Sequence, residues 1–268
     1  MSLDQNQIDR LGDELYAALV AGQTVPNLRD RVAGITKEHA YRIQARMISR
    51  RVSAGEQVVG KKIGVTSRAV QTMLGVFEPD FGILLSGMVY ADGAEIPTGT
   101  LIQPKAEGEI AFVLKRDLVG PGITAADVIA ATDHVSACFE IVDSRIRDWD
   151  IQIQDTIADN ASCGVYVVGA DKVDPRDVDL ALAGMVAELN GEVMVTGAGA
   201  AVQGSPANAV AWLANTLGSL GTPLLAGETI LSGALAPMFL FDPGDTLTMR
   251  VGGIGTCSIS FAKERVDA

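Results

Sequence analysis

Glu107-Gly-Glu-Ile-Ala-Phe-Val-Leu114 is the stretch of sequence that decides the fold. Its side chains alternate strictly, so Glu107 and Glu109 share one face while the apolar residues at 110, 112 and 114 share the other. This period of two predicts a half-buried β-strand. Carboxylates at positions i and i+2 stand about 7 Å apart, which is too far for a shared hydrogen bond but suitable for holding one cation between them.

A third acid, Glu140, lies in a second strand-like run over residues 135–142. It alternates with Phe139 and Ile141, so its side chain leaves the face that those two bury. Three converging carboxylates repel one another unless a cation neutralises them, and Mg²⁺ or Mn²⁺ suits such oxygen ligands. We therefore predict a divalent metal site formed by Glu107, Glu109 and Glu140. The alternative is that these acids only line the wet face of an antiparallel strand.

The composition restricts the class of protein. With 268 residues, 48% hydrophobic and 20% charged, the chain can bury a large core. A net charge of −12 leaves no basic stripe for nucleic acid or an anionic membrane. No run of about 18 apolar residues and no signal-peptide pattern is found, so we expect a cytoplasmic protein. Three cysteines without paired spacing are expected to be reduced core residues.

The order of elements along the chain predicts an α+β fold. A helical N-terminal region over 1–56, with helices at 3–22 and 37–54, precedes a β-rich catalytic domain over 57–268 with mixed, rolled β-structure. Within that domain we expect a turn over 78–82 and a two-residue hairpin at Asn190-Gly191. Its only predicted helices cover 67–74, 124–132 and 205–217.

Five separated motifs occur in a fixed order along the chain. They are Lys62-Ile-Gly-Val-Thr66, Pro79-Asp-Phe-Gly82, Gln103-Pro-Lys-Ala-Glu-Gly-Glu-Ile110, Glu140-Ile-Val-Asp-Ser-Arg145 and Asp159-Asn-Ala-Ser-Cys-Gly164. Together they resemble the fumarylacetoacetate hydrolase superfamily, and within it the hydratases of catechol meta-cleavage pathways. The resemblance covers nearly the whole chain and implies the same rolled β-structure and metal site.

The resemblance implies a metal-dependent hydro-lyase of aromatic catabolism. Such an enzyme adds water to 2-hydroxypenta-2,4-dienoate, a small 2-hydroxydienoate, and gives 4-hydroxy-2-oxopentanoate. One alternative is the related 4-oxalocrotonate decarboxylase, which releases CO₂. Another is a catalytically silent subunit associated with that decarboxylase, although the intact set of three carboxylates argues against silence. The glycine-rich, apolar sequence also suggests a homo-oligomer.

Lys62 is the first catalytic residue that the resemblance implies. The superfamily keeps a lysine at this position, where its charge can hold the substrate carboxylate or stabilise a dienolate. Without the resemblance, Lys62 is equally well read as a surface lysine at a strand edge. We expect its neighbour Lys61 to be the surface lysine of the pair.

Asp80 is the second implied catalytic residue, because the hydratases keep an acid here and the decarboxylases carry an apolar residue. Its carboxylate can move a proton to or from the substrate. The alternative is an Asp that only shapes a turn. Ser162 and Ser232 are expected to hydrogen-bond substrate oxygens, or else to be turn serines.

Two other classes of site are not expected. The only histidines, His39 and His134, lie in no triad-like context, so a Ser/His hydrolase and C–C bond hydrolysis are disfavoured. The run Gly197-Ala-Gly-Ala-Ala-Val-Gln-Gly204 has its third glycine misplaced for a dinucleotide-binding loop, and no acid follows about 20 residues later.

Overall fold

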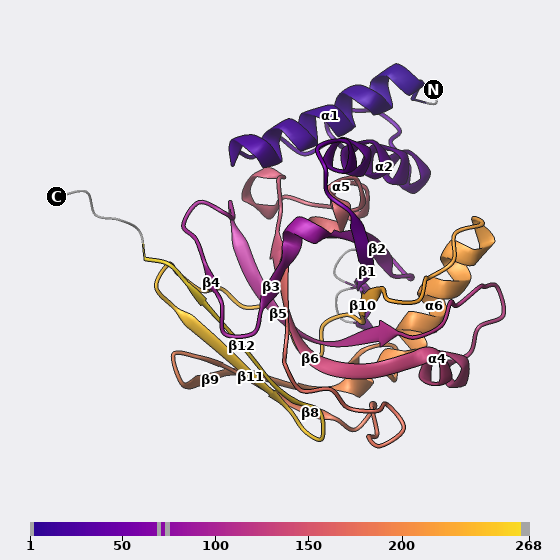
Figure 1. Cartoon of the computed structure of the whole chain (residues 1–268). Helices are drawn as coiled ribbons and strands as arrows, with labels where there is room; N and C mark the ends of the chain where they lie inside the picture. The colour runs from indigo at the N-terminus through magenta and orange to yellow at the C-terminus, as the bar shows by residue number, and fades with distance from the viewer. Residues whose placement is uncertain (1–2, 69–70, 73–75, 264–268) are drawn as a thin grey trace.

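The computed structural model describes residues 3–68, 71–72 and 76–263 and shows two β-sheets with helices around them (Figure 1). The larger sheet has seven strands in the order β2-β1-β10-β5-β6-β7-β3. Its strands are β1 (Val58–Gly64), β2 (Asp80–Leu85), β3 (Val89–Ala91), β5 (Pro104–Leu114), β6 (Thr132–Asp143), β7 (Cys163–Val168) and β10 (Thr229–Leu231). The predicted α+β fold with mixed, rolled β-structure is confirmed.

The smaller sheet has five strands in the order β4-β12-β11-β8-β9. These are β4 (Glu95–Ile96), β8 (Gly184–Leu189), β9 (Glu192–Ala198), β11 (Thr246–Val251) and β12 (Gly255–Phe261). Its inner face packs on the outer face of the larger sheet, where Met185 and Met249 meet the side chains of β5 in the main hydrophobic core. The predicted hairpin is confirmed, since Asn190 (φ 53°) and Gly191 (φ 86°) both adopt the left-handed conformation between β8 and β9.

Strands β5 and β6 form the centre of the larger sheet and pair antiparallel, with Glu107 opposite Glu140. Ile110 and Phe112 enter the main core, as their alternation predicts. The opposite face is also buried, because Ala111 packs in a second apolar cluster inside the curl of the sheet. The expected half-buried strand is therefore wrong in one respect. The face that carries the acids is an interior face.

The helices are α1 (Gln5–Ala21), α2 (Lys37–Ser53), α4 (Ala125–Ala131), α5 (Ile153–Ala158) and α6 (Pro206–Ser219). Short 3₁₀ turns occur at η1 (Ser86–Met88), η2 (Arg147–Trp149), η3 (Asn160–Ser162) and η4 (Gly199–Ala201). The helices predicted near residues 124 and 205 are confirmed. The helix predicted over 67–74 lies partly outside the described residues.

The N-terminal helices begin and end where the sequence indicates. Asp4 and Thr36 cap α1 and α2, and Gly22 ends α1 in the left-handed conformation. Both helices share an apolar cluster with α5, a helix that the sequence did not predict. Figure 1 shows these three helices together at one end of the molecule. The proposed domain division near residue 56 stays a prediction.

One element differs from its prediction in a way that affects the site. The turn expected over 78–82 is wrong from Asp80 onward, because β2 starts there and pairs with β1. Tertiary pairing with β1 overrides the local turn signal of Pro79-Asp80. Asp80 is thereby held at the first position of a strand instead of at a loop tip.

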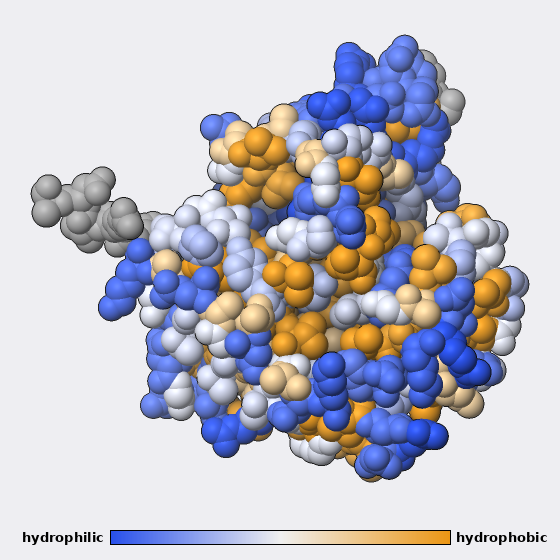
Figure 2. All heavy atoms as spheres, in the orientation of Figure 1, coloured by the Kyte–Doolittle hydropathy of each residue, from blue (hydrophilic) through white to orange (hydrophobic). Residues whose placement is uncertain are grey.

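In the described part of the chain, no helix is both long and apolar enough to cross a bilayer. Figure 2 shows a mostly hydrophilic surface over α1 and the lower rim, with apolar residues gathered between them. Among the exposed apolar side chains is Phe77, 94% exposed. The homo-oligomer suggested by the sequence stays a prediction.

Candidate active site

The three predicted metal ligands lie together inside the curl of the larger sheet. Glu107 and Glu109 come from β5 and Glu140 from β6, and one carboxylate oxygen of each lies within 4.8 Å of the other two. Glu109 and Glu140 are at most 1% exposed, and Glu107 is half-buried. The alternation of β5 and the register with β6 account for this convergence. The interpretation of these acids as a wet strand face is therefore wrong.

The hydrogen bonding of this cluster leaves acceptor capacity unused. Glu109 accepts one bond from the Gly233 amide at 2.8 Å through Oε2, while its Oε1 and both oxygens of Glu140 have no hydrogen-bond partner among the described residues. Buried charged oxygens without partners cost several kcal/mol unless something compensates them. One cation at about 2.1–2.4 Å from each oxygen spans separations of roughly this size, so the donor set fits a hard divalent ion.

Lys62 on β1 supplies a positive charge beside the cluster. Its Nζ lies 3.1 Å from Glu140 Oε1, and both side chains are at most 4% exposed. Burial alone would lower the pKa of Lys62, but the negative charges of Glu140 and Asp80 outweigh burial and raise it. The raised pKa favours the ammonium form of Lys62, and its side chain faces the acids.

Lys61, in contrast, is not the surface lysine that the sequence suggested. It is 4% exposed and forms an ion pair with the nearly buried Glu228. Consecutive residues of a strand point to opposite faces, so Lys61 leaves the site for the other side of the sheet. There Glu228 Oε2 also accepts the Leu225 amide at 2.9 Å, which makes this pair a structural link between β1 and the segment before β10.

Asp80 reaches the site from the start of β2. It is 1% exposed, and neither of its carboxylate oxygens has a hydrogen-bond partner among the described residues. A Cβ on Gly64 would lie 2.2 Å from Asp80 Oδ1 and 3.6 Å from Lys62 Nζ, so the acid and the lysine meet over a residue that must be glycine. Burial raises the pKa of Asp80 to about 6, although the charge of Lys62 opposes this rise.

The pKa values of Glu107 and Glu109 are shifted in the same direction. Burial raises the pKa of Glu107 and Glu109, and the charge of Glu140 adds to the rise in both. Repulsion among buried acids is the expected cause. The protein thus holds these groups in an environment that favours a bound proton or a bound cation.

The two predicted serines are both buried, with different partners. Ser162 Oγ lies 3.1 Å from Thr156 Oγ1, so part of its hydrogen-bonding capacity is already used. Ser232 Oγ has no partner among the described residues. Ser232 immediately precedes Gly233, whose amide binds Glu109 and whose open side packs against Thr66. Ser232 therefore stands beside the cluster with a free hydroxyl.

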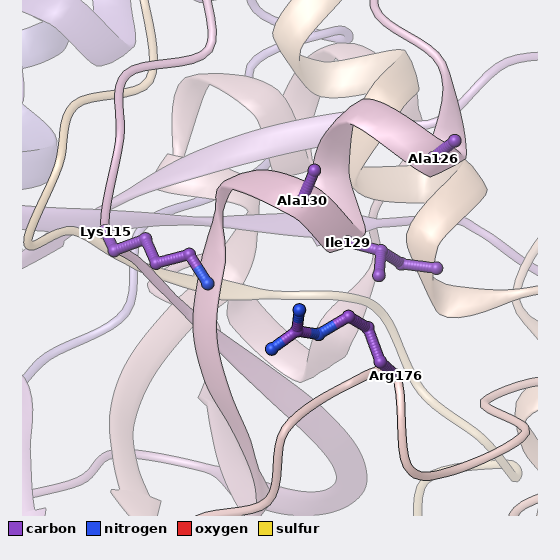
Figure 3. Close-up of a pocket in the computed structure, with 5 residues that line it drawn as sticks. All are labelled: Lys115, Ala126, Ile129, Ala130 and Arg176. Atoms are coloured by element: carbon purple, nitrogen blue, oxygen red, sulfur yellow. The ribbon is translucent and has the colours of Figure 1, made fainter.

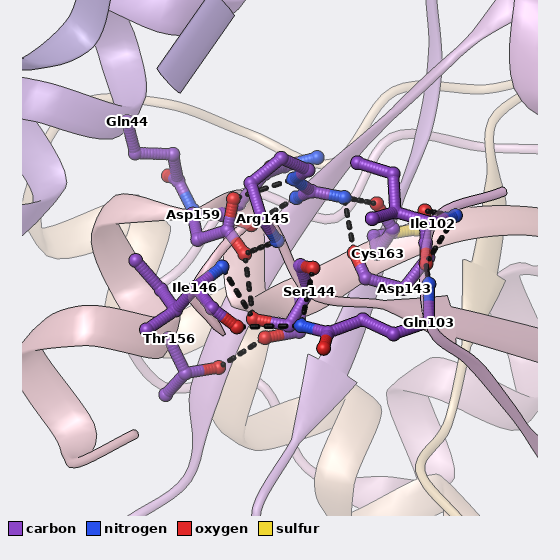
Figure 4. A network of polar contacts seen from close by, with 12 residues as sticks. Gln44, Ile102, Gln103, Asp143, Ser144, Arg145, Ile146, Thr156, Asp159 and Cys163 are labelled. Carbon is purple, nitrogen blue, oxygen red and sulfur yellow. Dashed lines mark hydrogen bonds and ion pairs between the residues drawn. The ribbon is translucent and has the colours of Figure 1, made fainter. Parts of the chain in front are cut away.

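The sequence interpretation gave no role to Arg145 and Asp159, although both lie in quoted motifs. Figure 4 shows Arg145 at the centre of a network beyond the end of β6. Its Nε donates to Asp159 Oδ1 at 2.5 Å, and its guanidinium also donates to the carbonyls of Asp143, Cys163 and Asp159. Asp159 Oδ2 accepts from the Arg145 amide and from Ser144 Oγ. The sequence signal that could have revealed this network is the arginine in Asp143-Ser144-Arg145, directly after a strand of buried residues.

This network adjoins a backbone segment in a strained, left-handed conformation. Asn160, Ala161 and Ser162 have φ of 55°, 51° and 53°. Left-handed residues other than glycine cost about 1–2 kcal/mol each, and such strain gathers at functional sites. Val65, which follows the Lys62 strand, also has a positive φ of 57°. Val65 belongs to the same motif as Lys62, which pairs with Glu140 of the acidic cluster.

Two residues of α2, Tyr41 and Gln44, were given no role from the sequence. The ring of Tyr41 stacks on Phe81 with centroids 4.4 Å apart, and Phe81 follows Asp80. Gln44 Nε2 donates to the Phe81 carbonyl at 2.9 Å and to the Ile157 carbonyl at 3.2 Å. Helix α2 therefore contacts the strand that carries Asp80.

Other candidate sites offer less chemistry. The surface pocket in Figure 3, about 370 Å³, is lined by Lys115, Arg176 and residues of α4. It lies beyond the end of β5, and Arg176 there pairs with Asp174. His39 caps α2 with Thr36, and His134 pairs with Asp133. The three cysteines are buried and free, as predicted.

Known proteins resemble this chain along most of its length. It is 55% identical over 262 residues to a 2-hydroxyhexa-2,4-dienoate hydratase of Comamonas testosteroni, covering 97% of this chain and 99% of that protein. It is 60% identical over 220 residues to a 2-hydroxypent-2,4-dienoate hydratase of Pseudomonas putida, covering 82% and 99%.

A similar solved structure is the 4-oxalocrotonate decarboxylase from Pseudomonas putida G7, complexed with magnesium and adipate. The TM-score is 0.94 at 35% identity, with 97% of this chain and 99% of that chain covered. The fumarylacetoacetate (FAA) hydrolase C-terminal family matches residues 60–261, which include all of the acids of the cluster. The order of motifs, the rolled sheet and these matches agree, and the chain belongs to the fumarylacetoacetate hydrolase family.

Proposed function

We propose that this protein is a divalent-metal-dependent hydro-lyase that adds water to 2-hydroxypenta-2,4-dienoate and gives 4-hydroxy-2-oxopentanoate. The observation that carries the proposal is a buried set of three glutamates with unused acceptor oxygens, next to one lysine and one separate acid. Two relatives at 55% and 60% identity that are named as dienoate hydratases support the same reaction class.

Glu107, Glu109 and Glu140 are the residues that would hold the cation, with Mg²⁺ or Mn²⁺ proposed. When bound, the cation supplies positive charge that orients the carboxylate and 2-oxygen of a dienoate and polarises the conjugated carbonyl. Oxygen-only ligands favour these hard ions over softer metals. The Gly233 amide keeps Glu109 in place by binding one of its oxygens and leaving the other free.

Lys62 stabilises negative charge on the substrate oxygens. Because its pKa is raised, the ammonium stays charged throughout the working pH range and acts as an electrostatic partner instead of a base. Its contact with Glu140 also fixes the direction of that carboxylate.

Asp80 moves the proton. A carboxyl whose pKa is about 6 can give up or accept a proton near neutral pH. Transfer of a proton to C5 of the dienol, with loss of the 2-hydroxyl proton, gives a 2-oxo-3-enoate. Water then adds at C4, a base accepts the water proton, and C3 gains a proton to give 4-hydroxy-2-oxopentanoate. Asp80 is suited to the first transfer as an acid and to the second as a base. The reaction thus needs no Ser/His pair.

The second candidate is decarboxylation of 4-oxalocrotonate, favoured by the TM-score of 0.94 to the decarboxylase structure. The acid at position 80 argues for hydration, because hydration requires a proton donor to C5 of the substrate. The test is to supply 2-hydroxypenta-2,4-dienoate and 4-oxalocrotonate separately with Mg²⁺ or Mn²⁺ and to identify the products. Release of CO₂ without any hydration would favour the decarboxylase, and unchanged turnover after exhaustive chelation would reject the metal site.

A further inference from the structure

The starting observation is the outer edge of β2, the terminal strand of the seven-stranded sheet. On its inner edge β2 pairs with β1 from Gly64↔Asp80 onward. An edge strand exposes unpaired amide and carbonyl groups on its other side unless something covers them. Here two buried side-chain amides, Gln44 and Asn160, take the place of the missing strand.

Asn160 forms a two-way link to the backbone of Ile83. Its Oδ1 accepts the Ile83 amide at 2.8 Å, and its Nδ2 donates to the Ile83 carbonyl at 2.9 Å. This repeats the pair of bonds that a neighbouring antiparallel residue would make. Gln44 binds the Phe81 carbonyl at 2.9 Å, two residues earlier on the same edge. Both amide side chains are at most 3% exposed.

Asn160 is itself held from the strand that carries a predicted metal ligand. It follows Asp159, which is bound to Arg145 beyond the end of β6, and Glu140 lies on β6. The connection runs along the chain from Glu140 to Arg145, through the Arg145–Asp159 ion pair to Asn160, and through its hydrogen bonds to Ile83, three residues after Asp80 on β2. The left-handed φ of Asn160, 55°, aims its amide at the edge of β2.

We infer that Asn160, assisted by Gln44, is a positioning residue that sets the place of Asp80 relative to the three glutamates. This inference rests on the proposed function of Asp80. Asn160 links η3 to the edge of β2, so Asp80 keeps a fixed position relative to Glu107, Glu109 and Glu140. A shift of about 1 Å in a reacting group can cost on the order of 10²-fold in rate, so loss of this link affects turnover.

The experiment is a double-mutant cycle of Asn160→Ala and Asp80→Asn, measured as kcat with saturating Mg²⁺ or Mn²⁺ and as the Kd of the metal. We expect Asn160→Ala to lower kcat by about 10- to 100-fold when Asp80 is present and by less than about 2-fold in the Asp80→Asn background, because coupled residues are not additive. The Kd of the metal should stay unchanged. Amide hydrogen exchange of metal-free protein should show lost protection at Ile83.

Asn215 provides a matched control. Its Oδ1 accepts the Ile123 amide and its Nδ2 donates to the Ile123 carbonyl, both at 2.8 Å, so it makes the same two-way link elsewhere in the molecule. Asn215→Ala should lose protection at Ile123 and keep kcat within about 2-fold. If Asn160→Ala does not fold, Asn160→Asp keeps the acceptor for Ile83 and tolerance of a positive φ, and it enters the same cycle.

The outcomes separate the inference from the proposed function. An equal loss of kcat from Asn160→Ala with and without Asp80 would overturn the positioning role, as would unchanged kcat after loss of Ile83 protection. In both cases Asp80→Asn alone still reports the catalytic acid. If Asp80→Asn by itself keeps most of the turnover, the assignment of Asp80 and the positioning role built on it both fail.

Discussion

Two buried charged regions lie close together in this molecule, and their hydrogen bonding differs. Around Arg145 and Asp159, three bonds converge on one carboxylate and the guanidinium donates to three backbone carbonyls. Around Glu109 and Glu140, three of four carboxylate oxygens have no hydrogen-bond partner among the described residues, and Lys62 forms an ion pair with one of them, Glu140 Oε1, at 3.1 Å. In the first region the protein itself satisfies the buried charges, whereas the second keeps unused acceptor oxygens that a bound cation would satisfy. Burial of charge alone does not distinguish them, but unused acceptor capacity does.

The largest expected effect comes from Glu109→Gln in the incomplete region. Turnover should fall by about 10⁴-fold, because several kcal/mol of stabilisation by the cation is lost and about 1.4 kcal/mol corresponds to each factor of ten. Calorimetric titration should show weaker Mg²⁺ binding, and circular dichroism an intact fold. Asp159→Asn in the complete region should instead cost about 3–5 kcal/mol of unfolding free energy. If Glu109→Gln destabilises the metal-free protein as much as Asp159→Asn does, the contrast between the regions fails.

Asp80→Asn is expected to have the next largest effect. Asn keeps the size and reach of the side chain but cannot transfer a proton, so turnover should fall by about 10²- to 10⁴-fold with little change in metal affinity. Steady-state kinetics together with metal titration checks both parts. A variant that retains most of its hydratase turnover would remove Asp80 from the mechanism and weaken the preference for hydration over decarboxylation.

The paired lysines sharpen the comparison within a single strand. Lys62→Met should reduce turnover by roughly 10²-fold, since the charge opposite the developing enolate is lost. Lys61→Met should leave the metal site intact but lower the unfolding free energy by about 3–5 kcal/mol, because Glu228 would remain buried without its partner. Chemical denaturation and kinetics on both variants test this. Similar losses of turnover at the two positions, with stability unchanged in each, would contradict the assigned facing of β1.

The smallest predicted effect concerns how much a bound metal raises the stability of the protein, and how this increase changes with pH. Burial raises the pKa of Asp80 to about 6 and that of Glu107 and Glu109 as well, whereas these groups titrate near 4 in the unfolded chain. The folded protein then binds more protons than the unfolded chain, so these groups lower stability as pH rises from about 4 through their folded pKa values.

A cation binds the ionised carboxylates, so its affinity rises over the same range. The increase in Tm caused by Mg²⁺ should therefore grow between pH 5 and pH 8, as scanning calorimetry would show. Glu109→Gln should reduce this growth. An increase in Tm that shrinks as the pH rises would mean that protons and metal do not compete for the cluster.

The sequence was sufficient to locate the acidic cluster because the information was periodic and local. Alternation assigned Glu107 and Glu109 to one face, and the second strand supplied Glu140. Sequence periodicity could not show that this face turns inward, because that depends on how strongly the whole sheet curls. The resemblance of separated motifs was needed to assign Lys62 and Asp80.

The remaining features depend on contacts between distant segments. Lys61 was misplaced because its partner Glu228 lies 167 residues away. The roles of Arg145 and Asn160 were missed because most of their partners are backbone groups, which carry no signature in the sequence. Helix α5 was too short to show a period of its own, and contacts with distant segments stabilise it, including its packing with α1 and α2 and the ion pair of Asp155 with Arg29.

The contact of α2 with β2 restricts how this chain can be recombined with its relatives. The family match starts at residue 60, after both N-terminal helices. Tyr41 and Gln44 nevertheless brace the strand that carries Asp80. A crossover between residues 53 and 58 would follow the apparent boundary but divide this unit between two parents. A crossover before Lys37 would instead inherit the helix and the strand together.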